Sequence, residues 1–159
     1  MSLFENGEYQ YRDTFFVLFH KTQRPDVARI KKSLEGLGGR YDVVNVQVDD
    51  NGQFESITVK SPYDFSAMDI VYVEGDEVEQ QVKDLIEEFR SITLIGDEAS
   101  KLKLLKGCNA RFDVFHFEHI DSALAGEEDL DPGGLLLVME KLSDMSEGIG
   151  LDPQSMSLL

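Results

Sequence analysis

The sequence predicts an α+β fold in which helices pack on a mainly antiparallel sheet. Two patterns carry this prediction: an Asn51-Gly52 pair joins two segments of alternating polarity, and three other segments repeat apolar residues at steps of three and four. The first pattern is typical of a β-hairpin and the second of amphipathic helices. With 159 residues, 42% of them hydrophobic, the chain suffices for one domain over 1–159, with 1–13 and 149–159 as tails or edge segments.

The first strongly apolar segment is Phe15–Phe19, which is apolar at both odd and even positions. A strand with one wet face would alternate instead, so we expect a central strand covered on both sides. Pro25 then suits the first position of a helix. The glycines at 36, 38 and 39 are expected to end this helix. Its apolar stripe consists of Val27, Ile30, Leu34 and Leu37.

The clearest local signal is the hairpin. Asn51-Gly52 is the preferred pair for a two-residue type I′ turn, because both positions need a positive φ. Pairing across such a turn places Val46 opposite Ile57, Val44 opposite Val59 and Gln47 opposite Ser56. One face of the pair is then apolar and the other polar, as a half-buried antiparallel pair requires.

A further strand is predicted at 68–74, where apolar residues alternate along the chain. Asp76 with Glu79 three residues later has the spacing of a helix-capping box, although aspartate replaces the usual serine or threonine. A second helix is expected from there. Its apolar stripe consists of Val78, Val82, Leu85, Ile86 and Phe89.

The second half of the chain predicts a short helix at 97–106, a strand at 111–119 and an acidic loop at 121–131. A last helix is expected to begin at Asp131-Pro132 and to end at Gly148. Its apolar stripe consists of Leu135, Val138, Met139 and Leu142. A strand–helix–hairpin–helix–strand series is that of ferredoxin-like sandwiches. The extra strand before the second helix makes the prediction a ferredoxin-like variant.

A ferredoxin-like sandwich places its first two helices on one face of the sheet, which leaves the second face of the first strand to be covered. We expect the C-terminal helix to cover it, because an intramolecular element carries no association cost. The alternative is a second copy of the protein, which would bury the open face in a dimer.

The chain is strongly acidic, with a net charge of −16, but the charge is uneven. Residues 1–40 carry seven basic and five acidic side chains, out of 15 and 31 in the whole chain. An acidic surface repels phosphate backbones, so we expect no nucleic-acid partner. We expect a protein partner or a homo-oligomer. A candidate interaction face for an acidic partner is formed by Arg24, Arg29, Lys31 and Lys32.

The single cysteine, Cys108, excludes a disulfide within the chain and favours a reducing compartment. The first twelve residues lack the apolar run of a signal peptide. The longest apolar runs are far shorter than the ~20 residues of a membrane span. We therefore expect a cytoplasmic protein with no membrane contact.

Few side chains suggest chemistry. His116 and His119 are three residues apart on a predicted strand and point to opposite faces, while His20 lies at the other end of the sheet. We therefore expect separate, partly exposed histidines and no metal site. Cys108 has no base beside it in the sequence, so a nucleophilic role is not expected.

Two loops resemble ligand-binding motifs only superficially. Acidic residues at 127–131 and the segment Asp49–Gly52 both lack the spacing of an EF-hand. The glycines at 36–39 follow a helix, whereas phosphate-binding loops follow a strand and open a helix. We expect no cofactor.

These observations favour a small non-catalytic binding or interaction domain of unknown ligand. Two alternatives remain: a small enzyme whose catalytic carboxylates are hidden among 31 acidic residues, and an acidic inhibitor of a basic protein. A pocket holding carboxylates of raised pKa would favour the enzyme. A flat acidic face would favour the inhibitor, and a contiguous apolar patch would favour a binding module or an oligomer.

Overall fold

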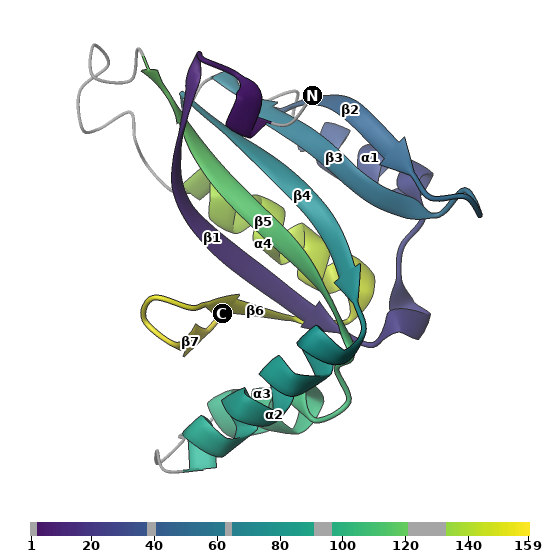
Figure 1. Ribbon diagram of the computed structural model, residues 1–159, viewed down its shortest axis with the longest axis vertical. Coiled ribbons are helices and arrows are strands. Elements are labelled where there is room, and N and C mark those ends of the chain that lie inside the picture. Colours follow the sequence, from purple (N-terminus) through teal and green to yellow (C-terminus); the bar gives the residue numbers. More distant parts are fainter. Residues whose placement is uncertain (1–2, 38–40, 63–64, 91–96, 121–132) are drawn as a thin grey trace.

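The computed structural model describes residues 3–37, 41–62, 65–90, 97–120 and 133–159. Their strands form one antiparallel sheet of seven strands, in the order β2-β3-β4-β5-β1-β6-β7 (Figure 1). The strands are β1 (Tyr9–Phe19), β2 (Asp42–Val48), β3 (Phe54–Ser61), β4 (Ser66–Glu74), β5 (Ala110–His119), β6 (Ile149–Asp152) and β7 (Ser157–Leu158). The α+β class is confirmed. The ferredoxin-like arrangement is not confirmed, because the sheet has more strands than that series provides.

Four α-helices and two 3-10 turns accompany the sheet in the described residues. They are η1 (Leu3–Glu5), η2 (Lys21–Gln23), α1 (Val27–Glu35), α2 (Asp76–Arg90), α3 (Asp97–Leu105) and α4 (Gly133–Ser146). No described helix is long and apolar enough to cross a membrane.

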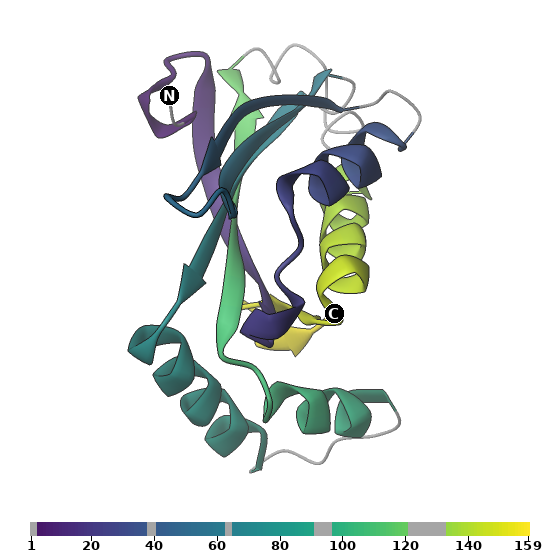
Figure 2. The same cartoon turned by 90° about the vertical axis from the view of Figure 1, so that its right-hand side faces the viewer.

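Helices α1 and α4 lie side by side on one face of the sheet, which we call the first face (Figure 2). Tyr41, which directly precedes β2, is tied to α4 because its hydroxyl donates a 2.8 Å hydrogen bond to the Gly134 carbonyl. The largest core cluster lies between these helices and the sheet. Its buried members include Val17, Phe19, Ile30, Leu34, Phe54, Phe112, Val114, Val138, Met139 and Leu142.

The opposite side, or second face, is covered at its two ends. At one end, α2 and α3 pack on the sheet and on β6 (Figure 2). Their buried side chains form a second cluster: Leu18, Val78, Val82, Leu85, Phe89, Leu105, Cys108, Ile149 and Leu151. At the other end, η1 covers a third cluster made of Leu3, Ala67 and Phe117. Because side chains alternate along a strand, Val17 and Phe19 face α4 while Leu18 faces α2.

The prediction of which helices share a face was wrong. The C-terminal helix does cover the first strand, but it lies on the same face as α1, and α2 lies on the other. The reason is that α4 leads directly into β6, which pairs with β1 at Phe16↔Leu151. Gly148 permits this turn, since a Cβ there would lie 2.6 Å from the Leu18 carbonyl oxygen.

The hairpin is present, but its turn is not type I′. The Gly52 N–H bonds to the Asp49 carbonyl (2.9 Å) and the Asp49 N–H to the Gln53 carbonyl (2.9 Å). The loop therefore has three residues, and among them only Gly52 has a positive φ, of 77°. This is the geometry of a type I turn followed by a bulge at a left-handed glycine.

The register of the hairpin is partly as predicted. Gln47 pairs with Ser56 as expected, but Val59 lies opposite Val43 rather than Val44. Asn45 causes the shift: its φ of 51° inserts a bulge into β2. The bulge lets both Val43 and Val46 pack against the first-face core.

Both predicted tails contain strands. β1 begins at Tyr9 rather than at Phe15, and residues 149–159 form β6 and β7, with Pro153 in the turn between them. Helix α2 begins as expected, but the Gly75 carbonyl accepts the hydrogen bonds from the N–H groups of Val78 and Glu79. Asp76 is therefore the first helical residue and not the cap. The predicted acidic loop at 121–131 lies outside the described residues.

Candidate functional site

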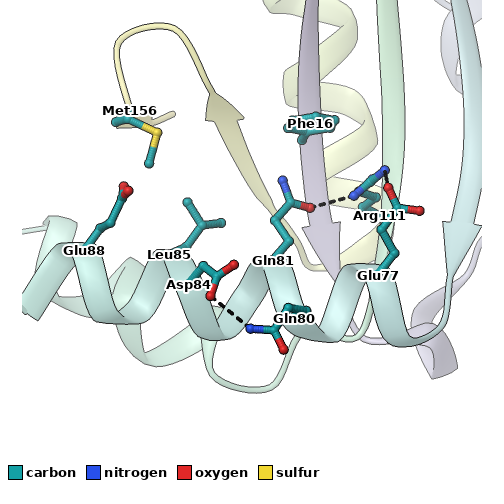
Figure 3. A pocket seen from close by; sticks show the side chains of 9 residues that line it. All are labelled: Phe16, Glu77, Gln80, Gln81, Asp84, Leu85, Glu88, Arg111 and Met156. Atoms are coloured by element: carbon teal, nitrogen blue, oxygen red, sulfur yellow. Dashed lines mark hydrogen bonds and ion pairs between the residues drawn. The ribbon is translucent and has the colours of Figure 1, made fainter.

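A groove between α2 and the second face of the sheet is the best candidate for a functional site. Its volume is about 510 Å³. Figure 3 shows α2 forming one wall, with Phe16 of β1 and Arg111 of β5 on the sheet side and Met156 at the far end. The side chains from α2 are spaced three and four residues apart, which places them on one helix face. They are Glu77, Gln80, Gln81, Asp84, Leu85 and Glu88.

The groove combines apolar and acidic side chains. Phe16, Leu85 and Met156 supply the apolar surface, and Leu85 is 5% exposed because the rest of it belongs to the second-face core. Asp84 and Glu88 stand along the α2 wall (Figure 3). Asp84 accepts a 3.0 Å hydrogen bond from the Gln80 side chain, which holds the carboxylate on the helix surface.

Arg111 is the one basic residue that lines the groove, and its charge is neutralised within the protein. Its side chain is 9% exposed, and its Nε and Nη2 donate to the two carboxylate oxygens of Asp113. Nη1 donates to Gln81 Oε1 at 2.8 Å, and Nη2 contacts Glu77 Oε1 at 3.3 Å. The guanidinium also lies 4.9 Å from the ring centre of Phe16. These contacts occupy most of its five N–H donors, so it is poorly placed to bind an external anion.

Asp113 lies beside the groove and is held by this pair. Burial raises the pKa of its carboxyl, while the hydrogen bonds and charge of Arg111 oppose the shift. A buried carboxyl group held by a two-point guanidinium contact has primarily a structural role. The pair fixes the sheet side of the groove, and through Gln81 and Glu77 it also positions α2.

The single cysteine and the three histidines do not line the groove. Burial raises the pKa of Cys108 to about 11, and its thiol donates to the Leu104 carbonyl at 3.4 Å. Such a thiol is protonated at neutral pH and packs as a small apolar group.

The three histidines occupy separate places, as predicted. His20 Nδ1 lies 2.7 Å from Thr22 Oγ1 in an exposed turn, and His119 packs edge-on against Tyr9. His116 differs from the prediction, because it is 7% exposed rather than partly exposed, and its Nδ1 lies 3.0 Å from Asp13 Oδ1. Among the described residues, no three metal-ligating side chains gather in one place.

The loops that resembled ligand-binding motifs have structural roles where they are described. Asp49 Oδ1 accepts from the backbone N–H groups of Asn51 and Gln53, both at 2.9 Å, and these bonds lower its pKa. Gly36 lies at the end of α1. Residues 38–40 and the acidic residues 127–131 lie outside the described residues.

Of the four basic residues predicted as an interaction face, three are exposed on one helix and the fourth is largely buried. Arg29, Lys31 and Lys32 are exposed on α1. Arg24 precedes the helix and is largely buried: its guanidinium lies 3.7 Å from the ring centre of Tyr72 and bonds to Gln53 and to the Phe54 carbonyl. Arg24 therefore has a structural role, and of the four predicted residues the three on α1 remain candidates for an interaction face.

The groove was not predicted from the sequence. The apolar stripe predicted for α2 contains neither Glu77 nor Gln81, so the pattern does not place these residues near the sheet. The available signal was the alternation at 110–114, where Arg111 and Asp113 interrupt apolar positions at a spacing of two. That spacing puts both charges on one face of a strand, which indicates a paired, partly covered site.

Comparison with known proteins gives no family assignment: no protein-family model, curated protein or solved structure matches the chain.

Proposed function

We propose that this protein is a non-catalytic binding domain, and that it binds a basic, partly apolar segment of a partner protein in the groove between α2 and the sheet. The observation that carries the proposal is the lining of the groove. Apolar side chains lie beside exposed carboxylates, and the one lining cation, Arg111, is already paired inside the protein. A lysine or arginine side chain flanked by apolar residues complements this surface.

The charge of the whole chain supports the same partner. A net charge of −16 attracts basic proteins from a distance and raises their association rates at low salt. It also disfavours nucleic acids as partners. A reducing, cytoplasmic location agrees with the single buried cysteine, and we keep it as part of the proposal.

The test uses an amphipathic probe peptide with the sequence Leu-Lys-Lys-Leu-Leu-Lys-Lys-Leu, carrying a fluorescent label. Binding is measured by fluorescence anisotropy at low and at physiological salt. We expect the wild-type protein to bind the peptide and a glutamate counterpart of the peptide not to bind. Affinity should weaken with salt, because part of the attraction is between exposed charges.

A matched pair of variants tests whether the peptide binds in the groove. Asp84→Lys with Glu88→Lys reverses two charges of the groove wall, whereas Glu79→Lys with Glu87→Lys makes the same change elsewhere on α2. Both variants change the net charge equally. The proposal expects a much larger loss of affinity for the groove variant. Equal losses in both variants, or an unbound probe in the wild-type protein, would reject it.

One observation favours the alternative of an enzyme, namely the raised pKa of Asp113 next to the groove. A general acid must reach its substrate, and here both carboxylate oxygens accept hydrogen bonds from Arg111. A catalytic role would therefore require the pair to open when substrate binds.

A further inference from the structure

The second face of the sheet carries another candidate site at the end opposite α2, where the chain covers itself. Residues Leu3–Glu5 form η1, which contacts β1 and β4 and lies on the side of the sheet away from α1 and α4 (Figure 2). We call η1 and the turn that follows it, residues 3–8, the strap. The strap then reverses direction and enters β1 at Tyr9.

The strap is held by a small number of specific contacts. The Leu3 side chain is 2% exposed and packs against Ala67 and Phe117. The Leu3 N–H donates a 2.9 Å hydrogen bond to Asp69 Oδ2, and Thr58 Oγ1 donates to Asp69 Oδ1 at 2.6 Å. A buried carboxylate thus binds the backbone of the strap while an apolar recess beside it takes the leucine.

The next residue of the strap is bound differently. Phe4 is 58% exposed and leans on an aromatic surface, with ring centres 5.5 Å from Tyr11, 5.4 Å from Phe115 and 4.8 Å from Phe117. Aromatic contacts of this kind add to apolar burial without enclosing the ring. Together, Leu3 and Phe4 occupy a site with one closed apolar recess, one open aromatic shelf and one hydrogen-bond acceptor.

The surface continues beyond the strap. A groove of about 250 Å³ lies over β2, β3 and β4, and Asp69 borders both this groove and the seat of Leu3. Five of its seven lining residues are polar; the seven are Asn45, Gln47, Ser56, Ile57, Thr58, Asp69 and Val71. The residue that precedes the leucine in a longer bound peptide would therefore stand next to this groove.

We propose that the seat of Leu3 and Phe4 is a peptide-binding site for another protein chain, and that the strap occupies it as an internal competitor. The ligand is a short peptide that adopts the 3-10 turn seen at Leu3–Glu5 and has two consecutive large apolar residues, leucine followed by an aromatic residue. The N–H of its leucine reaches Asp69, as that of Leu3 does. This site is distinct from the groove at α2, because it recognises apolar side chains and a backbone amide rather than positive charge.

The strap has the features of a segment that can exchange. Residues 3–5 are attached to the sheet by one buried side chain, one amide–carboxylate hydrogen bond and an exposed ring, whereas the neighbouring strands are paired along their length. The end of the strap is anchored next to β1, where the Glu8 carbonyl accepts a 2.9 Å hydrogen bond from the Ile120 N–H. Segments with so few buried contacts open locally without global unfolding. A tethered segment competes at a high effective concentration, so an external peptide binds weakly until the strap is released.

The experiment uses the full chain and a labelled probe peptide, acetyl-Ser-Leu-Phe-Glu-Asn-Gly-Glu-amide, which copies residues 2–8. Leu3→Asp releases the strap, because a charged side chain does not fit the recess. We expect the peptide to bind this variant about tenfold or more tightly than it binds the wild-type protein. Leu104→Asp is the matched control, since Leu104 is 57% exposed on α3. It should bind the peptide as the wild type does.

Two further arms give the proposal a specific signature. Adding Asp69→Asn to the Leu3→Asp variant should reduce binding about tenfold, because the leucine N–H then meets a neutral acceptor. A peptide with aspartate in place of its leucine should not bind. Circular dichroism verifies that each variant is folded. A folded Leu3→Asp variant that binds the peptide no better than the wild type would overturn the proposal.

If the Leu3→Asp variant does not fold, hydrogen exchange on the wild-type protein tests whether the strap opens locally. The Leu3 amide should exchange through local opening, much faster than the amide of Val114 in the sheet. If both amides exchange only by global unfolding, the strap does not open by itself and the proposed competition is wrong.

Discussion

Replacing Arg111 by methionine should lower the free energy of unfolding more than almost any other single change on the second face. Methionine retains much of the apolar stem that packs near Phe16, but it removes the charge and every donated hydrogen bond. Asp113 is then left 8% exposed without its main cationic partner. Removing only one partner of a buried ion pair is strongly destabilising, because it leaves the other charge buried without compensation.

The expected loss can be worked from the individual contacts. Removing one partner of a buried ion pair costs about 3–5 kcal/mol in the free energy of unfolding. The contact with Glu77 adds little, because the Glu77 side chain is 76% exposed and surface pairs contribute about 0–1 kcal/mol. The hydrogen bond to Gln81 contributes on the order of 1 kcal/mol. We therefore expect Arg111→Met to lose about 3–5 kcal/mol, most of it from the stranded Asp113.

Urea unfolding of four proteins measures this loss as a double-mutant cycle. The proteins are the wild type, Arg111→Met, Asp113→Leu and the double variant. The double variant should recover most of the stability lost by Arg111→Met, because it leaves neither charge buried without a partner. Equal slopes of the free energy against urea would show that the comparison is valid.

The pH dependence of Arg111→Met gives a second readout. Burial raises the pKa of Asp113 and Arg111 opposes that rise, so the variant should have a still higher pKa at this carboxyl. A carboxyl group whose pKa is raised in the folded state destabilises the protein when the group is ionised, and this destabilisation decreases as pH falls and the group becomes protonated. The deficit of the variant should therefore shrink on acidification. A loss below about 1 kcal/mol, or a double variant as unstable as the sum of the single variants, would refute the reasoning.

Three other predictions follow from particular positions. Gly52→Val forces a β-branched residue to a φ of 77° and should cost about 1–3 kcal/mol; an unchanged melting temperature would contradict the observed turn. Gly148→Ala should be severely destabilising, because its Cβ would lie 2.6 Å from the Leu18 carbonyl oxygen, and near-normal urea unfolding would show that α4 and β6 can shift. Burial lowers the pKa of His116 despite Asp13, so this group should stabilise the fold above about pH 6.5 and lose that contribution as pH falls through its folded pKa. His116→Gln should make the urea midpoint depend less on pH between neutral pH and about pH 5. A variant whose midpoint changes with pH as the wild type's does would argue against this role.

Local structure could largely be predicted from the sequence. The apolar stripe of α2 is buried as expected at Val78, Val82, Leu85 and Phe89, because periodicity reports which side of a helix is apolar. Periodicity does not report which sheet face receives that side. The pairing of α1 with α4 depends on the path from α4 into β6 beside β1, a contact between residues far apart in the chain.

The errors at single residues have similar causes. Asn51-Gly52 favours type I′ from its own residues, but Asp49 caps the backbone N–H groups of Asn51 and Gln53 and selects a three-residue loop. The sequence places Arg24 next to the basic residues of α1, but in the structure its side chain bonds to Gln53 of the hairpin and packs on the Tyr72 ring. The candidate groove needs residues of α2, two strands and the C-terminal turn, so no local pattern contains it.

The most direct test of the proposed binding function is to map where a basic segment binds. Titrating the isotope-labelled protein with the leucine–lysine peptide reports the contacts through amide and methyl chemical shifts in NMR spectra. We expect the shifts to concentrate on Phe16, Gln81, Leu85 and Met156, and the Asp84→Lys, Glu88→Lys variant to lose them. Shifts spread evenly over the acidic surface, or confined to a site away from α2, would contradict the proposed binding function.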